Sequence, residues 1–135
     1  MSRESARARA LLWWRQAAAD LRASSVLAEA GEWSHSCFQA QQAAEKSLKA
    51  LLADRDKDLR SHSLAALLRE LGGEVPQQWA AQARALDKLY APTRYPDALG
   101  DAAPMDVFGP EDAERAMQAA KAFLDWAATE LNPVA

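Results

Sequence analysis

The most constraining feature of this sequence is the stretch Trp33–Ala53, WSHSCFQAQQAAEKSLKALLA, which contains neither glycine nor proline. Alanine, glutamine, glutamate, lysine and leucine dominate it, and all five are strong helix formers. Small and apolar residues recur at spacings of three and four, as on one face of a helix: Cys37, Ala40, Ala44, Ser47 and Leu51. We therefore predict a central helix, capped by Ser34 or Ser36, with neighbouring helices on more than one side.

The rest of the chain also reads as helical. We predict helices over residues 5–30, 62–71, 76 to about 90, and from 110 onward, with Gly31 and Gly72-Gly73 ending the first and third. Ser61 or Ser63 is expected to cap the third helix. Four prolines and two glycines in residues 91–110 argue against regular structure there.

Length and composition predict one all-α domain. The 135 residues suit a single domain, residues 1–135, with flexible ends at 1–4 and 132–135. No run approaches the roughly 20 apolar residues of a membrane span, and the arginine-rich start leads into a helical pattern rather than a signal peptide. We therefore expect a cytoplasmic protein. The lone Cys37 cannot form an internal disulfide and is expected to be buried.

The net charge of −3 is unevenly distributed. Residues 1–22 carry five arginines against two acids, whereas residues 96–135 carry eight acids against two basic residues. This pattern fits either a local basic binding surface or two differently solvated faces. Two histidines and one cysteine, without a ligand spacing, indicate no zinc site, and no glycine-rich phosphate loop is present. We expect no metal and no cofactor.

Four segments, in this order, resemble the HEPN domain family, a helical family often encoded beside minimal nucleotidyltransferases. They are residues 13–24 with 31–33, then 37–52, 61–68 and 86–98. The resemblance covers about residues 11–126 and is most specific in QQAAEKSLKALL and YAPTRYPDA taken together. It implies an up-and-down bundle of four long helices plus one short helix. It also implies a homodimer and a nucleotidyltransferase partner, in a toxin–antitoxin-like pair.

His62 is the sharpest candidate residue. The resemblance places it at the family's loop histidine, and six residues separate it from Arg55, as in the Arg-x4–6-His motif of metal-independent HEPN ribonucleases. In such a reaction the histidine acts as general acid or base and the arginine stabilises charge on the phosphate. The alternatives are a phosphate or nucleotide contact, or a purely structural role at the start of the third helix.

A second candidate group follows the fourth helix. Pro92 and Pro96 restrict the backbone around Arg94, Tyr95 and Asp97, so the arginine fork is well placed to meet an anion. Alternatively, Arg94 pairs with Asp97 or another acid and holds the loop on the bundle, with aromatic rings packed beneath.

Lys46 and Lys49 form the third candidate group. They correspond to the family's Glu-Lys-x-x-Lys pattern and share a helix face, so both can meet one phosphate. The alternative is a solvated face with a Glu45–Lys49 pair.

Three functional hypotheses follow. We rank first a non-enzymatic module that binds a nucleotide, RNA or a partner protein through a cleft edged by Lys46, Lys49, His62 and Arg94. A structural dimerising bundle ranks second. A ribonuclease using Arg55 and His62 ranks third.

Overall fold

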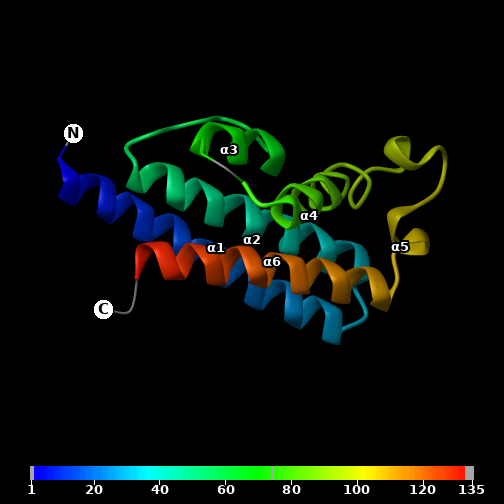
Figure 1. The fold of residues 1–135 in the computed structure, drawn as a ribbon. Helices are drawn as coiled ribbons and strands as arrows, with labels where there is room; N and C mark the ends of the chain where they lie inside the picture. Colours follow the sequence, from blue (N-terminus) through cyan, green and yellow to red (C-terminus); the bar gives the residue numbers. More distant parts are fainter. Residues whose placement is uncertain (1, 74, 133–135) are drawn as a thin grey trace.

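The computed structural model describes residues 2–73 and 75–132, and none of these residues forms a β-strand (Figure 1). The elements are α1 (Arg3–Glu29), α2 (Trp33–Asp54), α3 (Leu64–Leu71), α4 (Gln77–Asp87), the 3-10 helix η1 (Pro96–Leu99), α5 (Pro104–Val107) and α6 (Pro110–Leu131). This confirms the predicted all-α bundle. Within the described ranges, no helix has both the length and the apolar character needed to cross a bilayer.

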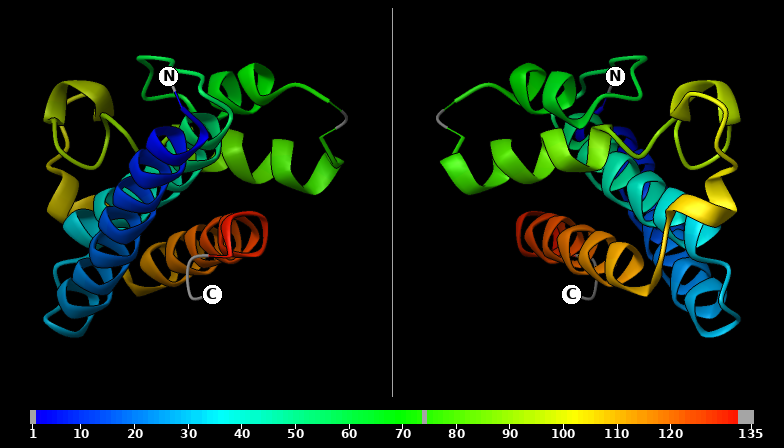
Figure 2. Two further views of the ribbon diagram at one scale, coloured as in Figure 1. Left: turned by 90° about the vertical axis from the view of Figure 1, so that its left-hand side faces the viewer. Right: turned by 90° about the vertical axis from the view of Figure 1, so that its right-hand side faces the viewer.

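Helix α2 is the centre of the bundle, as predicted. Fourteen of its 22 residues are buried, and it contacts α1, α3, α5 and α6. Helices α1, α2 and α6 run alongside one another, and the start of α1 lies at the same end of the molecule as the end of α6 (Figure 1). Viewed along the bundle, α3 and α4 project to one side and the η1–α5 segment to the other (Figure 2).

A reciprocal pair of serines fastens α1 to α2. Ser24 Oγ donates to the carbonyl of Ser36 at 2.7 Å, and Ser36 Oγ donates to the carbonyl of Ser24 at 2.8 Å. Both serines are fully buried. The predicted capping role of Ser34 or Ser36 is therefore wrong. Glu32 is the N-cap residue and makes no side-chain hydrogen bond, and the Ser36 hydroxyl is engaged by α1 instead.

The connection between α1 and α2 is as short as predicted. Gly31 adopts φ +78°, a left-handed conformation that glycine enters without a steric penalty. The amide of Glu32 bonds back to the carbonyl of Leu27 at 2.9 Å. The two helices are therefore antiparallel neighbours, and α1 contacts α2 along its length.

Several predicted boundaries need correction. The third helix begins at Leu64 rather than at 62, because the Ser63 hydroxyl caps it by accepting from the amide of Ala66 at 3.1 Å. The fourth helix ends at Asp87 and has only 11 residues. Residues 91–110 do contain regular structure, contrary to the prediction. Pro96 and Pro104 each begin a short helix, a position where proline's missing N–H costs nothing.

The predicted flexible ends at 1–4 and 132–135 fall partly outside the described residues. Residues 1 and 133–135 are among those not described. Ser2, by contrast, caps α1 by accepting from the amide of Ser5 at 3.0 Å, and Arg3 already belongs to the helix.

The buried thiol of Cys37 gives a test of the packing. Burial raises its pKa from 9.0 to about 12, and the negative charge of Asp112 adds to that rise. The thiolate is the reactive form, so the folded protein should not react with Ellman's reagent at pH 8, whereas the urea-unfolded protein should react fully. Prompt labelling of the folded protein would show that Cys37 is not enclosed as described.

Candidate functional site

A series of polar and aromatic contacts along the edge of α2 centres on Glu45. Its side chain is only 3% exposed. Oε2 accepts from Lys49 Nζ at 3.0 Å, and Oε1 lies 3.3 Å from His62 Nδ1 and 3.4 Å from Gln42 Nε2. The predicted Glu45–Lys49 pair therefore exists, but it is not on a solvated face: Glu45 is buried and Lys49 is partly buried.

His62 is held at the surface by α2 and by an aromatic ring. Gln41 Nε2 donates to the backbone carbonyl of His62 at 3.2 Å, and the imidazole stacks on Tyr90 with ring centroids 4.5 Å apart. The side chain remains 59% exposed. A carboxylate only accepts, so a hydrogen bond to Glu45 requires a proton on Nδ1 of His62, and Nε2 has no partner among residues 2–73 and 75–132.

The segment that carries His62 is fixed by Asp87 at the end of α4. Its carboxylate accepts from the hydroxyl of Ser63 at 2.9 Å and from the amides of Leu64 and Ala65 at 2.6 and 3.2 Å. An acid at a helix N-terminus also opposes the partial positive charge of the helix dipole. Asp87 and Ser63 together therefore cap α3 and hold His62 in place.

Arg94 lies among three aromatic rings. The guanidinium carbon is 4.3 Å from the ring centroid of Phe38, 4.4 Å from that of Tyr90 and 4.8 Å from that of Tyr95. Nε donates to the carbonyl of Tyr90 at 2.9 Å, and Nη1 to the hydroxyl of Tyr95 at 3.3 Å. The predicted aromatic packing is present. The alternative of an Arg94–Asp97 or other acid pair is not found within the described residues, because the rings and a carbonyl hold the cation instead.

Three of the four residues predicted to edge the cleft come together, and Lys46 does not. His62 and Arg94 both contact Tyr90, and Lys49 joins them through Glu45. Lys46 turns towards α1, where Nζ lies 2.5 Å from Oδ2 of the buried Asp20.

Arg55 and His62 lie at opposite ends of α3. Arg55 Nη1 donates to the carbonyl of Leu71, the last residue of α3, at 2.8 Å, whereas His62 comes just before the first. Eight helical residues correspond to about 12 Å. The described chain therefore does not bring this pair together.

The remaining predicted residues sit at the outer edge of the group. Tyr95 is 52% exposed, and Asp97 is exposed in η1. The described residues contain no cluster of three or more histidines, cysteines or acids arranged to hold a metal.

Sequence reasoning did not assign a site role to Glu45, Gln41, Tyr90 or Asp87. Gln41 and Glu45 lie four apart in α2, beside the apolar stripe, and are both buried. Two buried polar side chains at that spacing would have been the signal for Glu45 and Gln41. Nothing in the sequence around Asp87 distinguishes it from any acid near a helix end.

What the assembled group can do follows from its charges. It presents an exposed imidazole and a guanidinium fixed by aromatic rings, with a buried carboxylate behind the imidazole. Cationic N–H donors held in a defined geometry are suited to a phosphate or a carboxylate.

Comparison with known proteins is consistent across sequence and structure. The HEPN domain family model matches residues 10–131. The crystal structure of a protein from Thermus thermophilus is 36% identical and superimposes with a TM-score of 0.87, covering 90% of this chain and 97% of that one. No curated protein matches this sequence significantly.

Two further crystal structures are similar. An archaeal HEPN homologue is 32% identical, with a TM-score of 0.76 and coverage of 88% of this chain and 94% of that one. A HEPN domain protein from Thermotoga maritima is 26% identical, with a TM-score of 0.71 and coverage of 89% and 97%.

The capping role of Asp87 is testable by stability. Asp87→Ala removes the acceptor for one hydroxyl and two amides at the start of α3. We expect the free energy of unfolding to fall by about 1–2 kcal/mol in urea denaturation. Asp106→Ala, in the short exposed helix α5, is the matched control and should change it by less than about 0.5 kcal/mol. Equal effects of the two substitutions would contradict the capping role.

Proposed function

This chain belongs to the HEPN domain family, and from that premise we propose that it is a non-enzymatic module that binds the phosphate of a nucleotide or of RNA through Arg94 and His62. Lys49 pairs with Glu45, so the charge of this buried carboxylate does not repel an anion at the imidazole. Tyr95, exposed beside Arg94, offers a ring on which a base can stack.

One observation carries the proposal: the charge of Arg94 is held in place without being neutralised. Three rings and a carbonyl fix the guanidinium, and no carboxylate of the described residues pairs with it. Two of its five N–H groups are used in hydrogen bonds, so others remain for an external acceptor. A cation held in one geometry loses little conformational entropy when it binds an anion.

His62 supports the same interpretation. Its ring stacks on Tyr90, which also contacts Arg94, so the imidazole and the guanidinium are both supported by the same ring. When both ring nitrogens are protonated, Nδ1 donates to Glu45 and the exposed Nε2, which faces no described partner, can donate to a phosphate. One phosphate can therefore approach both residues from solvent.

Binding is favoured over RNA cleavage because Arg55 lies at the far end of α3 from His62. In the ribonuclease hypothesis Arg55 would stabilise the charge that develops on the scissile phosphate. A guanidinium engaged with the Leu71 carbonyl does not do so within one chain.

The test compares Arg94→Lys with the wild type. Lysine keeps the charge but loses the planar fork and the stacking on three rings. We expect affinity for AMP and for a short single-stranded RNA to fall at least about tenfold in isothermal titration calorimetry. Arg115→Lys, on the exposed face of α6, is the matched control and should bind like the wild type.

Three outcomes would contradict the proposal. The first is equal affinity of Arg94→Lys and the wild type for AMP and for the RNA. The second is that the wild type binds neither probe, which would favour the hypothesis of a structural bundle. The third is cleavage of RNA by the wild type without added metal that is lost in His62→Ala, which would favour the ribonuclease.

The proposal extends to assembly and location. We propose a homodimer in the cytoplasm, with a separately encoded minimal nucleotidyltransferase as a toxin–antitoxin-like partner. Family membership alone supports this part of the proposal. We expect light scattering to give twice the 14.7 kDa chain mass. We also expect co-purification with a nucleotidyltransferase encoded beside it. A chain that remains monomeric at high concentration would contradict the dimer.

A further inference from the structure

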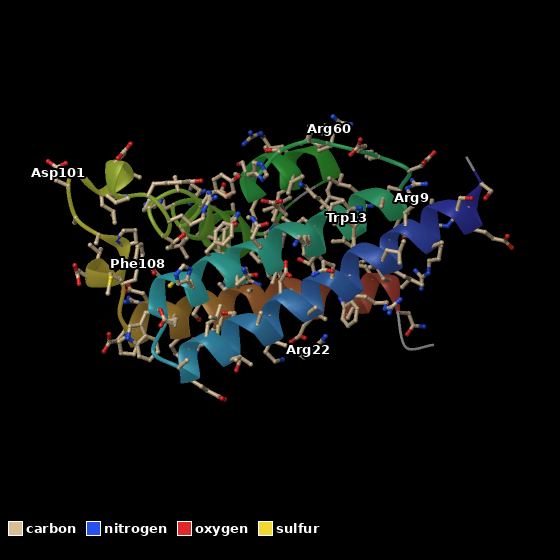
Figure 3. The ribbon with its side chains drawn as sticks, turned by 180° about the vertical axis from the view of Figure 1, so that it is seen from behind. Arg9, Trp13, Arg22, Arg60, Asp101 and Phe108 are labelled. Carbon is tan, nitrogen blue, oxygen red and sulfur yellow. The ribbon has the colours of Figure 1, made fainter. Side chains whose placement is uncertain are left out.

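A hollow lies between α1 and the connection from α2 to α3. It has a volume of about 250 Å³, and Trp13, Leu52 and Leu59 give it an apolar lining. Trp13 and Arg9 lie on the side of α1 that faces this connection, which carries Arg60, whereas Arg22 lies on the other side of α1 (Figure 3). The Arg94 and His62 side chains do not line this hollow.

Trp13 makes the hollow unusual. Among the residues that the structure describes, it is one of few large apolar side chains that stay exposed, at 37%. Lys49 Nζ lies over its indole, 5.5 Å from the ring centroid. An exposed indole in a concave site is a large apolar surface that a ligand can cover at little cost in side-chain entropy.

Most of the charges around the hollow neutralise one another. Arg9 Nη2 lies 3.1 Å from Asp56 Oδ1, and Lys49 pairs with Glu45 at 3.0 Å. These pairs leave little net charge to attract a ligand of one sign.

Two lining charges are left, and they have opposite signs. Lys57 Nζ donates to the carbonyl of Glu70 at 3.0 Å, which does not cancel its charge, and Asp58 is an exposed acid. Neither makes an ion pair with any residue among 2–73 and 75–132. A ligand that satisfies both must carry an anionic group and a cationic group.

From this complementarity we propose that the hollow binds a compact zwitterion with an apolar body, of the size and charge of a free amino acid. Its carboxylate meets Lys57, its ammonium meets Asp58 and its side chain covers the indole of Trp13. The volume is slightly below the roughly 300–1,000 Å³ of pockets for drug-sized molecules, which suits a ligand of this size. This inference does not depend on phosphate binding at Arg94.

The experiment follows the indole N–H signals of the full chain by NMR, with the Trp13 signal assigned from Trp13→Phe. The probes are L-phenylalanine and L-leucine. Two analogues of phenylalanine each lack one charge: 3-phenylpropionate has no ammonium, and phenethylamine has no carboxylate. We expect the Trp13 signal to shift saturably with an amino acid, with affinity at least about fivefold higher for L-phenylalanine than for either analogue.

Two substitutions then separate the two charges. Lys57→Gln should lower the affinity for L-phenylalanine about fivefold and leave that for phenethylamine unchanged. Asp58→Asn should do the same for L-phenylalanine and leave 3-phenylpropionate unchanged. Lys88→Gln and Asp106→Asn remove exposed charges away from the hollow and should bind as the wild type does, and circular dichroism checks that all variants fold.

Several results would overturn the inference. One is the absence of a saturable Trp13 shift with both amino acids. Another is equal affinity for 3-phenylpropionate and L-phenylalanine, which would make the hollow an anion site. A third is unchanged L-phenylalanine binding in both Lys57→Gln and Asp58→Asn. Arg94→Lys should leave L-phenylalanine binding intact. A failure of amino-acid binding at the hollow is therefore distinguishable from a failure of phosphate binding at Arg94.

Discussion

The arrangement of the site depends on one buried carboxylate. Glu45 is nearly inaccessible to water, and a charge in that position is costly unless it is paired and hydrogen-bonded. Lys49 supplies the opposite charge from the next turn of α2, and His62 supplies a donor from outside the helix. The requirement to satisfy Glu45 therefore draws the α2–α3 connection back onto α2 and sets the position of the imidazole.

The aromatic rings around Arg94 fix its position without cancelling its charge. An arginine that must stay in one place is usually fixed by a carboxylate, which also cancels its charge. Here the rings of Phe38, Tyr90 and Tyr95 and one carbonyl hold the guanidinium. Cation–π contacts orient a cation while leaving its N–H edge available. The same rings tie α2, the end of α4 and the loop before η1 together.

The fold could be predicted from the sequence more completely than the site. Helical periodicity and the absence of glycine and proline were enough to place α1, α2 and α6 within a few residues, because those signals are local. The short helices at Pro96 and Pro104 were missed, since a proline that breaks one helix equally begins another. His62 and Arg94 were identified from their motifs, but Lys46 was not distinguishable from Lys49 until Asp20 of α1 was seen to engage it. The capping role of Asp87 could not be predicted from the sequence, because it depends on where the start of α3 lies in space.

The serine pair near the turn between α1 and α2 has a consequence at the other end of these helices. Two helices packed mostly through alanines have few large side chains to stop one from sliding along the other, and the hydroxyls of Ser24 and Ser36 bond only at one setting. From Ser36 to Lys49 the helix extends about 20 Å. The pair thus fixes the register of α1 against α2. A slip of one turn, about 5.4 Å, would carry Lys49 past Trp13 and take the two out of reach of each other.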